Sequence, residues 1–157
     1  MKKINEKFLI SLIVFFIFLF FSVKTFANES AIFLTLKNKE VNLRQGPSFE
    51  YPIKLTYKKK YLPVIILDKS ETWRKINDYE NNSGWIHISQ LSKKKSAINI
   101  KNNAIIYKRS TIFSQPIAKV EKGRLLIIKK CKENWCKIKA GKYKGWFPKS
   151  YLWGKIR

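Results

Sequence analysis

The chain has 157 residues, with 33 Lys or Arg against 10 Asp or Glu, so its formal net charge at pH 7 is +23. Such an excess favours an anionic partner such as nucleic acid, lipid headgroups or an acidic polymer. Most of the basic residues are Lys, however, and Ile and Asn are common too. An AT-rich genome produces the same bias, so a selected basic surface and a compositional bias both remain open.

The first 27 residues have the pattern of a signal peptide. A start with three lysines precedes an apolar run from Phe8 to Val23, and Thr25-Phe26-Ala27 then supplies the small residues of a cleavage site. We expect cleavage after Ala27 and a periplasmic or otherwise exported protein, which argues against nucleic acid as a partner. A retained anchor helix is the alternative, although the run is short of the roughly 20 residues of a membrane span.

Residues 28–92 are expected to form a first domain of short strands. Pro63 marks a strand start or an edge strand, and Ser89-Gln90-Leu91 suits a single 3₁₀ turn. The strand-like runs are Ile32–Leu36, Val41–Arg44, Tyr51–Ile53, Tyr61–Leu67, Trp73–Ile76 and Gly84–Ile86.

The second half of the chain repeats the first. The motif Gly-Trp-apolar-x-x-Ser-x-Leu occurs at residues 84–91 and again at 145–152, and each copy follows another tryptophan. A period of about sixty residues indicates two copies of one small domain rather than a solenoid. The repeated positions expected to be structural are Gly84, Trp85, Leu91, Trp135, Gly145, Trp146 and Leu152.

Residues 93–96 are polar and Lys-rich, and we expect a linker there, followed by a second domain at 97–157. Its predicted strands follow the order of the first domain: Ala104–Tyr107, Pro116–Ile117, Leu125–Ile128, Trp135–Ile138 and Gly145–Phe147. The sequence after residue 27 contains no amphipathic helical pattern of useful length. Short strands separated by Gly, Pro and Asn turns predict an all-β fold of two small barrels.

Cys131 and Cys136 are the only cysteines. In an exported chain they are expected to form a disulfide. If Lys132–Trp135 is a four-residue hairpin loop, the two cysteines face each other across the strands at a distance that a disulfide can bridge. Two thiolates without a nearby His are too few for a zinc site. A redox-active pair is the alternative, but the Cys-x-x-Cys spacing is missing.

These motifs together resemble the exported, SH3-like branch of the bacterial SH3 domain family. The resemblance rests on Val41-Asn42-Leu43-Arg44-Gln45-Gly46-Pro47-Ser48, on Trp73-Arg74-Lys75-Ile76 and on Gly84 to Leu91. In the second domain Ile105 to Arg109 replace the Asn-Leu-Arg-x-Gly run. The resemblance implies two tandem SH3-like barrels of five to six strands in the cell envelope. It also implies binding of cell-wall peptides, a function that better-understood members perform beside wall hydrolases.

The candidate ligand groove lies in the first domain and is rich in aromatic residues. The resemblance places several tyrosines in loops near the groove of the family, and Tyr151 and Trp153 near its C-terminal end. Arg44 could contact a ligand carboxylate with two hydrogen bonds, or pair with an internal acid. Packing in the core or barrel rim is the alternative role for each aromatic. The candidate set is Arg44, Tyr51, Tyr57, Trp73, Tyr79 and Trp85.

No catalytic or metal site is expected. The sole histidine, His87, lacks an obvious partner, the carboxylates are scattered, and no phosphate-binding loop occurs. We therefore expect a non-enzymatic module without cofactors that binds cell-wall peptide (the peptidoglycan stem) or an envelope protein. The alternatives are a structural adaptor that packs on a partner protein, and association of the lysines with an anionic membrane surface.

Overall fold

The computed structural model describes residues 31–156. The predicted signal peptide, residues 1–27, lies outside the described residues, so cleavage and export remain predictions. Within residues 31–156, no helix is long and apolar enough to cross a membrane.

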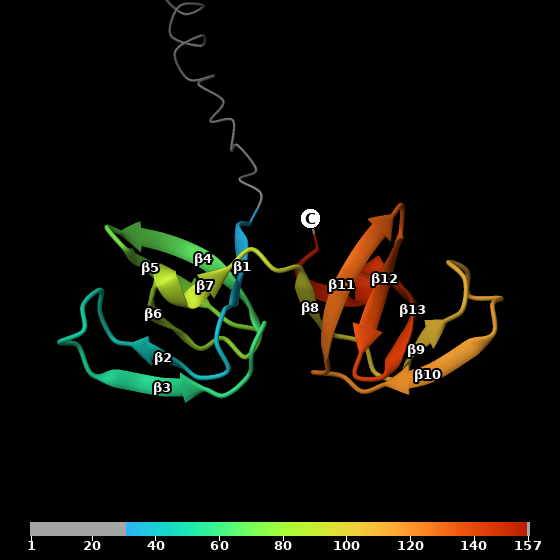
Figure 1. The fold of residues 1–157 in the computed structure, drawn as a ribbon, viewed down its shortest axis with the longest axis horizontal. Coiled ribbons are helices and arrows are strands. Elements are labelled where there is room, and N and C mark those ends of the chain that lie inside the picture. The colour runs from blue at the N-terminus through green and yellow to red at the C-terminus, as the bar shows by residue number, and fades with distance from the viewer. Residues whose placement is uncertain (1–30, 157) are drawn as a thin grey trace, which may run out of the picture. The chain divides into compact units, whose positions relative to one another are not determined.

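The first half of the described chain consists of seven short strands and one 3₁₀ turn (Figure 1). These are β1 (Phe33–Leu36), β2 (Val41–Arg44), β3 (Ile53–Tyr57), β4 (Pro63–Ser70), β5 (Trp73–Asn77), β6 (Ser83–His87), the turn η1 (Ile88–Gln90) and β7 (Leu91–Ser92). They form one antiparallel sheet in the order β3-β2-β6-β5-β4-β1-β7, which we call barrel 1.

The second half repeats this arrangement strand by strand. Its elements are β8 (Ser96–Asn99), β9 (Ala104–Tyr107), β10 (Pro116–Val120), β11 (Leu125–Lys132), β12 (Trp135–Ala140), β13 (Tyr143–Pro148), the turn η2 (Lys149–Tyr151) and β14 (Leu152–Lys155). The strand order, β10-β9-β13-β12-β11-β8-β14, matches that of barrel 1 position for position. This sheet is barrel 2. The predicted all-β fold of two tandem SH3-like barrels is confirmed.

Alternating burial along the strands gives each barrel its own core. In β12, for example, Cys136, Ile138 and Ala140 are buried while Lys137 and Lys139 are exposed. The core of barrel 1 is built from Leu36, Val41, Leu43, Tyr57, Val64, Ile76, Ile86 and Leu91, and that of barrel 2 includes Ala97, Ile106, Leu126, Ile128, Ile138, Phe147 and Leu152. The period-two pattern that predicted the strands therefore also separates core from surface.

The repeated Gly-Trp motif has one structural role in both barrels. A Cβ on Gly84 would lie 2.6 Å from the carbonyl oxygen of Arg44, and one on Gly145 would lie 2.6 Å from that of Tyr107. Each glycine thus lets one strand cross closely over its neighbour. Trp85 and Trp146 are half-buried on the outer face, where they pair with Arg44 and Tyr107. Leu91 and Leu152 are buried in the cores.

The two barrels differ at one buried position in their first strands. In barrel 1, Leu36 pairs with Leu91. In barrel 2, Asn99 takes the place of Leu36 and pairs with Leu152. Leu36 and Asn99 are both fully buried. The Asn99 amide nitrogen donates to the carbonyl oxygens of Lys101, Val120 and Glu121 at 2.9, 3.1 and 2.9 Å. Barrel 2 thereby carries a hydrogen-bonded polar side chain where barrel 1 has an aliphatic one.

Pro63 and the β11–β12 hairpin were the subject of two local predictions. Pro63 is the first residue of β4 and pairs with Thr35, in agreement with a strand start. The four-residue hairpin loop expected at Lys132–Trp135 is wrong, because Lys132 pairs with Trp135 and only Glu133 and Asn134 form the turn. Glu133 adopts a positive φ of 51°, which is typical of a tight two-residue connection.

Candidate functional site

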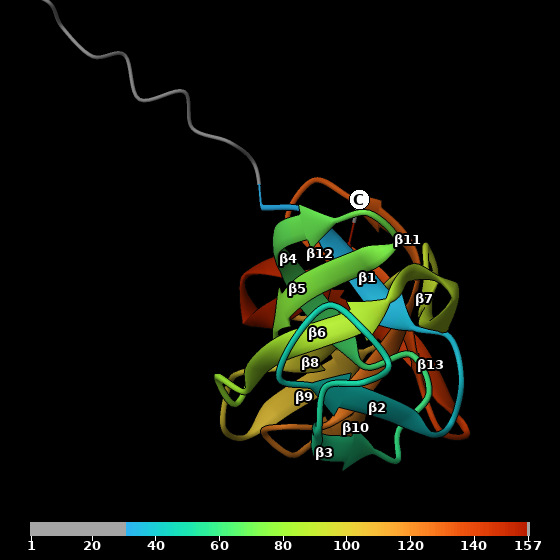
Figure 2. The same ribbon diagram turned by 90° about the vertical axis from the view of Figure 1, so that its left-hand side faces the viewer.

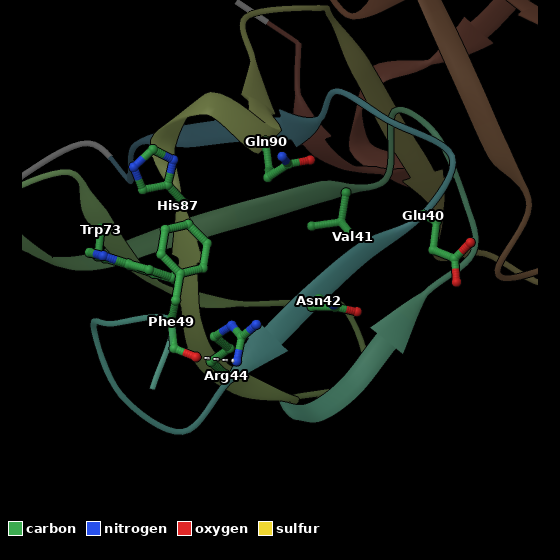
Figure 3. A pocket seen from close by; sticks show the side chains of 8 residues that line it. All are labelled: Glu40, Val41, Asn42, Arg44, Phe49, Trp73, His87 and Gln90. Atoms are coloured by element: carbon green, nitrogen blue, oxygen red, sulfur yellow. Dashed lines mark hydrogen bonds between the residues drawn. The ribbon is translucent and has the colours of Figure 1, made fainter. Parts of the chain in front are cut away.

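Barrel 1 carries a cleft of about 250 Å³ on its outer surface (Figure 3). Residues from β2, from the β2–β3 loop, from the start of β5 and from the end of β6 meet there. The lining residues are Glu40, Val41, Asn42, Arg44, Phe49, Trp73, His87 and Gln90.

Arg44 shapes the loop that forms one wall of the cleft. Its Nη1 donates to the carbonyl oxygens of Phe49 and Tyr51 at 2.9 and 2.7 Å. A backbone bond from Gln45 to Pro52 closes the loop, and Gly46 leaves room for the Tyr51 ring. Figure 2 shows this loop, residues 45–52, crossing in front of β6. Arg44 therefore donates to backbone carbonyl groups of the loop that follows it. Among residues 31–156 it does not pair with an internal acid, which was one of the two roles considered from the sequence.

Three rings form the aromatic wall of the cleft. The Phe49 ring lies 4.9 Å from that of Trp73 and 5.6 Å from that of His87, and the Trp73 and His87 rings are 5.3 Å apart. The Arg44 guanidinium lies 5.6 Å from the centre of the Phe49 ring. Trp73 is buried, whereas Phe49 is 65% exposed. The wall thus has a fixed base in Trp73 and an accessible surface in Phe49.

Polar side chains form the rest of the cleft. Asn42 accepts a hydrogen bond from Thr56 at 2.8 Å, and Gln90 accepts one from Asn38 at 2.6 Å. Glu40 is exposed at one end, and Arg44 lies toward the opposite end in Figure 3. An aromatic surface beside a cationic side chain, with an anionic side chain farther along the cleft, suits a short peptide that carries both charges.

His87 is held at the end of β6 by its own turn. Its Nδ1 lies 2.8 Å from the Ser89 hydroxyl and accepts from the Ser89 backbone N–H at 3.4 Å. The imidazole therefore caps η1 while its ring faces Phe49 and Trp73. Among residues 31–156, no three His, Cys, Asp or Glu side chains are grouped so as to hold a metal ion.

The structure brings together only part of the predicted groove. Arg44 and Trp73 line the cleft, and Tyr51 belongs to the loop that bounds it, with its side chain 48% exposed. Trp85, on β6, is paired with Arg44 of β2 on one side and with Lys75 of β5 on the other. The Tyr79 ring instead lies 5.8 Å from that of Trp153, away from the cleft-lining residues.

Tyr57 belongs to the core, so its placement in the groove is wrong. Its side chain is 7% exposed, and its hydroxyl donates to the Asp78 carboxylate at 2.9 Å. Burial in the barrel and, second, the negative charge of Asp78 raise the pKa of the Tyr57 hydroxyl far above its usual range. The hydroxyl therefore stays protonated as a donor to Asp78.

Phe49 and His87 were missed as cleft residues, as was Gln90. The exposed Phe49 follows directly on the Gly46-Pro47-Ser48 turn, and an apolar residue in a polar turn is a signal that the sequence did offer. The position of His87 next to Trp73 depends on the pairing of β5 with β6, which joins these two residues. Composition alone does not show this pairing.

Barrel 2 has a different surface at the corresponding positions. Tyr107 replaces Arg44 as the partner of the β13 tryptophan, and Pro148 replaces His87 opposite Trp135. The rings of Tyr107 and Trp135 lie 5.7 Å apart. Because neither the arginine nor the histidine is present at these two positions, barrel 2 lacks the mixed character of the cleft in barrel 1.

The predicted disulfide is confirmed. Cys131 and Cys136 are directly opposed on β11 and β12, are bonded, and have Cα atoms 4.0 Å apart. Cys136 is fully buried, so the bond ties the hairpin tip to the core of barrel 2.

Two small antiparallel β-barrels with short strands, tight turns and a shallow aromatic cleft define a tandem barrel module. The sequence profile described as "Bacterial SH3 domain" matches residues 37–93 and 101–154, which is more than half of the chain. The chain therefore belongs to the bacterial SH3 domain family. No curated protein matches the sequence.

Two solved structures illustrate how far the likeness extends. NlpC2 from Trichomonas vaginalis is 15% identical with a TM-score of 0.37, over 82% of this chain and 50% of that chain. NlpC1 from the same organism is 14% identical with a TM-score of 0.35, over 80% and 46%. The chain spans about half the length of either protein, and likeness at this level carries no functional argument.

Proposed function

We propose that this protein is an exported, non-enzymatic binding module that recognises cell-wall peptide through the cleft of barrel 1. The observation that carries the proposal is the exposed Phe49 ring, which is held over Trp73 and His87 beside the Arg44 guanidinium. An exposed aromatic surface next to a fixed cation suits a short peptide with apolar side chains and a free carboxylate.

The cleft is preformed, which supports binding without a large ordering cost. Arg44 uses Nη1 to hold the loop, and its Nε and Nη2 are further donors of the same guanidinium. Glu40 at the other end of the cleft suits an amine such as that of a diamino acid in a peptidoglycan stem. Membership of the bacterial SH3 domain family is consistent with this choice of ligand.

Two further observations support a binding protein of the cell envelope. The Cys131–Cys136 disulfide is suited to an oxidising compartment, which agrees with the predicted signal peptide. His87 points its ring into the aromatic wall and uses Nδ1 to cap a turn, so its geometry serves packing rather than proton transfer.

Co-sedimentation with isolated peptidoglycan tests this proposal. Both cores lie within residues 31–156, so the chain from residue 28 onward contains every strand that the structure describes. We expect retention at physiological salt, and at least a tenfold loss of affinity in Phe49→Ala, because an exposed aromatic contact is lost at the centre of the site.

The matched control is Phe113→Ala, which removes an exposed Phe from the corresponding loop of barrel 2. Circular dichroism would verify that both variants fold. Equal retention of the Phe49→Ala protein and the unsubstituted chain would refute a binding site at this cleft. Retention that disappears on adding salt, irrespective of Phe49, would reduce the interaction to non-specific charge attraction.

A further inference from the structure

The outer face of barrel 2 is strongly basic. Residues opposed in neighbouring antiparallel strands point to the same side of a sheet, so the register defines this face. Lys130 pairs with Lys137, which pairs with Trp146, and Trp146 pairs with Tyr107. In the next row Lys139 pairs with Lys144. We call Lys130, Lys137, Lys139 and Lys144 the basic face.

Barrel 1 provides an internal comparison, because the same rows exist there. Asp68 pairs with Lys75, which pairs with Trp85, and in the next row Asn77 pairs with Ser83. The four positions of the basic face thus correspond to Asp68, Lys75, Asn77 and Ser83. Three of the four are lysine in barrel 2 alone, so a chain-wide bias toward Lys does not explain why they gather on one barrel.

The lysines of the basic face have no internal counter-charge. Among residues 31–156 the one ion pair joins Lys132 and Glu133, whose side chains are both 76% exposed. All four lysines are exposed, and the Lys130 ammonium lies 5.9 Å from the centre of the Trp146 ring. Four like charges on adjacent rungs of a sheet repel one another, so an external anionic surface would stabilise them.

A loop with an exposed apolar tip begins at the end of one row of the basic face. The β9–β10 loop, residues 108–115, begins directly after Tyr107, which is the last residue of the row that contains Lys130, Lys137 and Trp146. At the tip Ile112 is 62% exposed and Phe113 is 91% exposed. The corresponding loop of barrel 1 instead packs its Phe49 on Trp73 and His87.

We propose that barrel 2 binds the surface of an anionic lipid bilayer through the basic face and the tip of the β9–β10 loop. The lysines would contact lipid headgroups, while Phe113 and Ile112 enter the boundary between headgroups and acyl chains. Trp146 and Trp135, both half-buried on the same face, suit the headgroup level, where one edge of a ring is apolar and the other is hydrated.

The apolar tip distinguishes a bilayer from a soluble polyanion. A dissolved acidic polymer would be attracted by the four lysines, but it offers no apolar phase for a phenylalanine that is 91% exposed. A bilayer offers both. This inference concerns barrel 2 and does not depend on the peptide cleft of barrel 1.

Vesicle flotation tests the proposal. The chain from residue 28 onward should be used, because the apolar run at residues 8–23 could bind lipid by itself. We expect flotation with vesicles of phosphatidylglycerol and phosphatidylcholine, and none with phosphatidylcholine alone. Lys130/Lys137/Lys144→Gln should lower the partition constant about 100-fold, since each lysine near an anionic surface contributes a factor of roughly five.

The matched control, Lys37/Lys39/Lys69→Gln, removes three exposed lysines from barrel 1 and the same total charge. It should lower the partition constant much less. An equal loss in the two triple variants would overturn the proposal, because binding would then depend on net charge alone.

Phe113→Ser should weaken flotation about tenfold, and Phe49→Ser should leave it unchanged. Binding that depends on the basic face but not on Phe113 would also overturn the proposal, in favour of a soluble polyanion. Because wall retention depends on Phe49 and lipid binding on Phe113, the two proposals fail in different variants.

Discussion

A single carboxylate organises the turn between β5 and β6. Asp78 is 4% exposed, and its two oxygens accept from the Tyr57 hydroxyl, the Glu80 N–H, and both the backbone and the side chain of Asn82, at 2.8–2.9 Å. Buried carboxylates are tolerated when their lone pairs are satisfied in this way. Asp78 therefore anchors a surface turn to a tyrosine of the core.

The same pair predicts how stability depends on pH. Because the pKa of Tyr57 is raised in the folded state, ionisation of tyrosine near its usual pKa of about 10 favours the unfolded chain. The stability that Tyr57 contributes is fully present below about pH 10 and is lost progressively above it, by up to about 1.4 kcal/mol per pH unit.

Urea denaturation of the unsubstituted protein and of Tyr57→Phe, between about pH 8 and pH 11, measures this effect. Tyr57→Phe should be less stable at pH 8 and should lose less stability at high pH. Parallel curves for the two proteins would rule out Tyr57 as the titrating group.

The sequence predicted the role of some individual residues and missed the role of others. The glycines and tryptophans of the repeated motif were expected to be structural because they recur at matched sites. Tyr57 was placed in the groove because nothing in its local sequence shows that Asp78, 21 residues away, accepts its hydroxyl. Phe49 was missed because its position depends on Arg44 holding the carbonyl groups of the loop.

At the level of elements, hairpins could be predicted more securely than their turns. The period-two pattern of Val41–Arg44 predicted β2 to the residue, since alternate side chains must enter the core. The β11–β12 connection was predicted two residues too long because Lys132 and Trp135 belong to the ladder. The register of this hairpin follows from the two-residue turn, in which Glu133 has a positive φ. The amino-acid composition of the segment does not reveal this backbone conformation.

The disulfide in this hairpin should contribute modestly to stability. It closes a loop of only a few residues, so the chain-entropy estimate is about 1–2 kcal/mol. Adding a reductant should lower the free energy of unfolding by that amount, as measured by denaturant titration. Cys131→Ser should be insensitive to the reductant, and a response in that variant would mean that the reductant acts elsewhere.

At the level of the whole molecule, charge is poorly balanced. The chain carries a formal charge of +23, and one exposed ion pair, Lys132–Glu133, is present among residues 31–156. Repulsion between lysines therefore opposes the compact state, and the two hydrophobic cores must offset it.

We accordingly expect added salt to stabilise the fold. Raising NaCl from about 20 mM to about 500 mM shortens the screening length severalfold and should raise the thermal midpoint. Lys130/Lys137/Lys144→Gln should show a smaller rise, because it removes three of the closely spaced charges. A thermal midpoint that falls with salt would show that attractive pairs dominate instead.

The difference between Leu36 and Asn99 bears on how a chain with two copies of one fold assembles correctly. While the chain is still unfolded, β8 could enter the slot of β1, because both strands fill equivalent places in the two sheets. Asn99 would then lie at a buried position without the carbonyl groups of Val120 and Glu121, and an unpaired buried amide costs about 1–3 kcal/mol. Leu36 in barrel 2 would leave those carbonyl groups without their donor. Each half of the duplication thus discriminates against the first strand of the other.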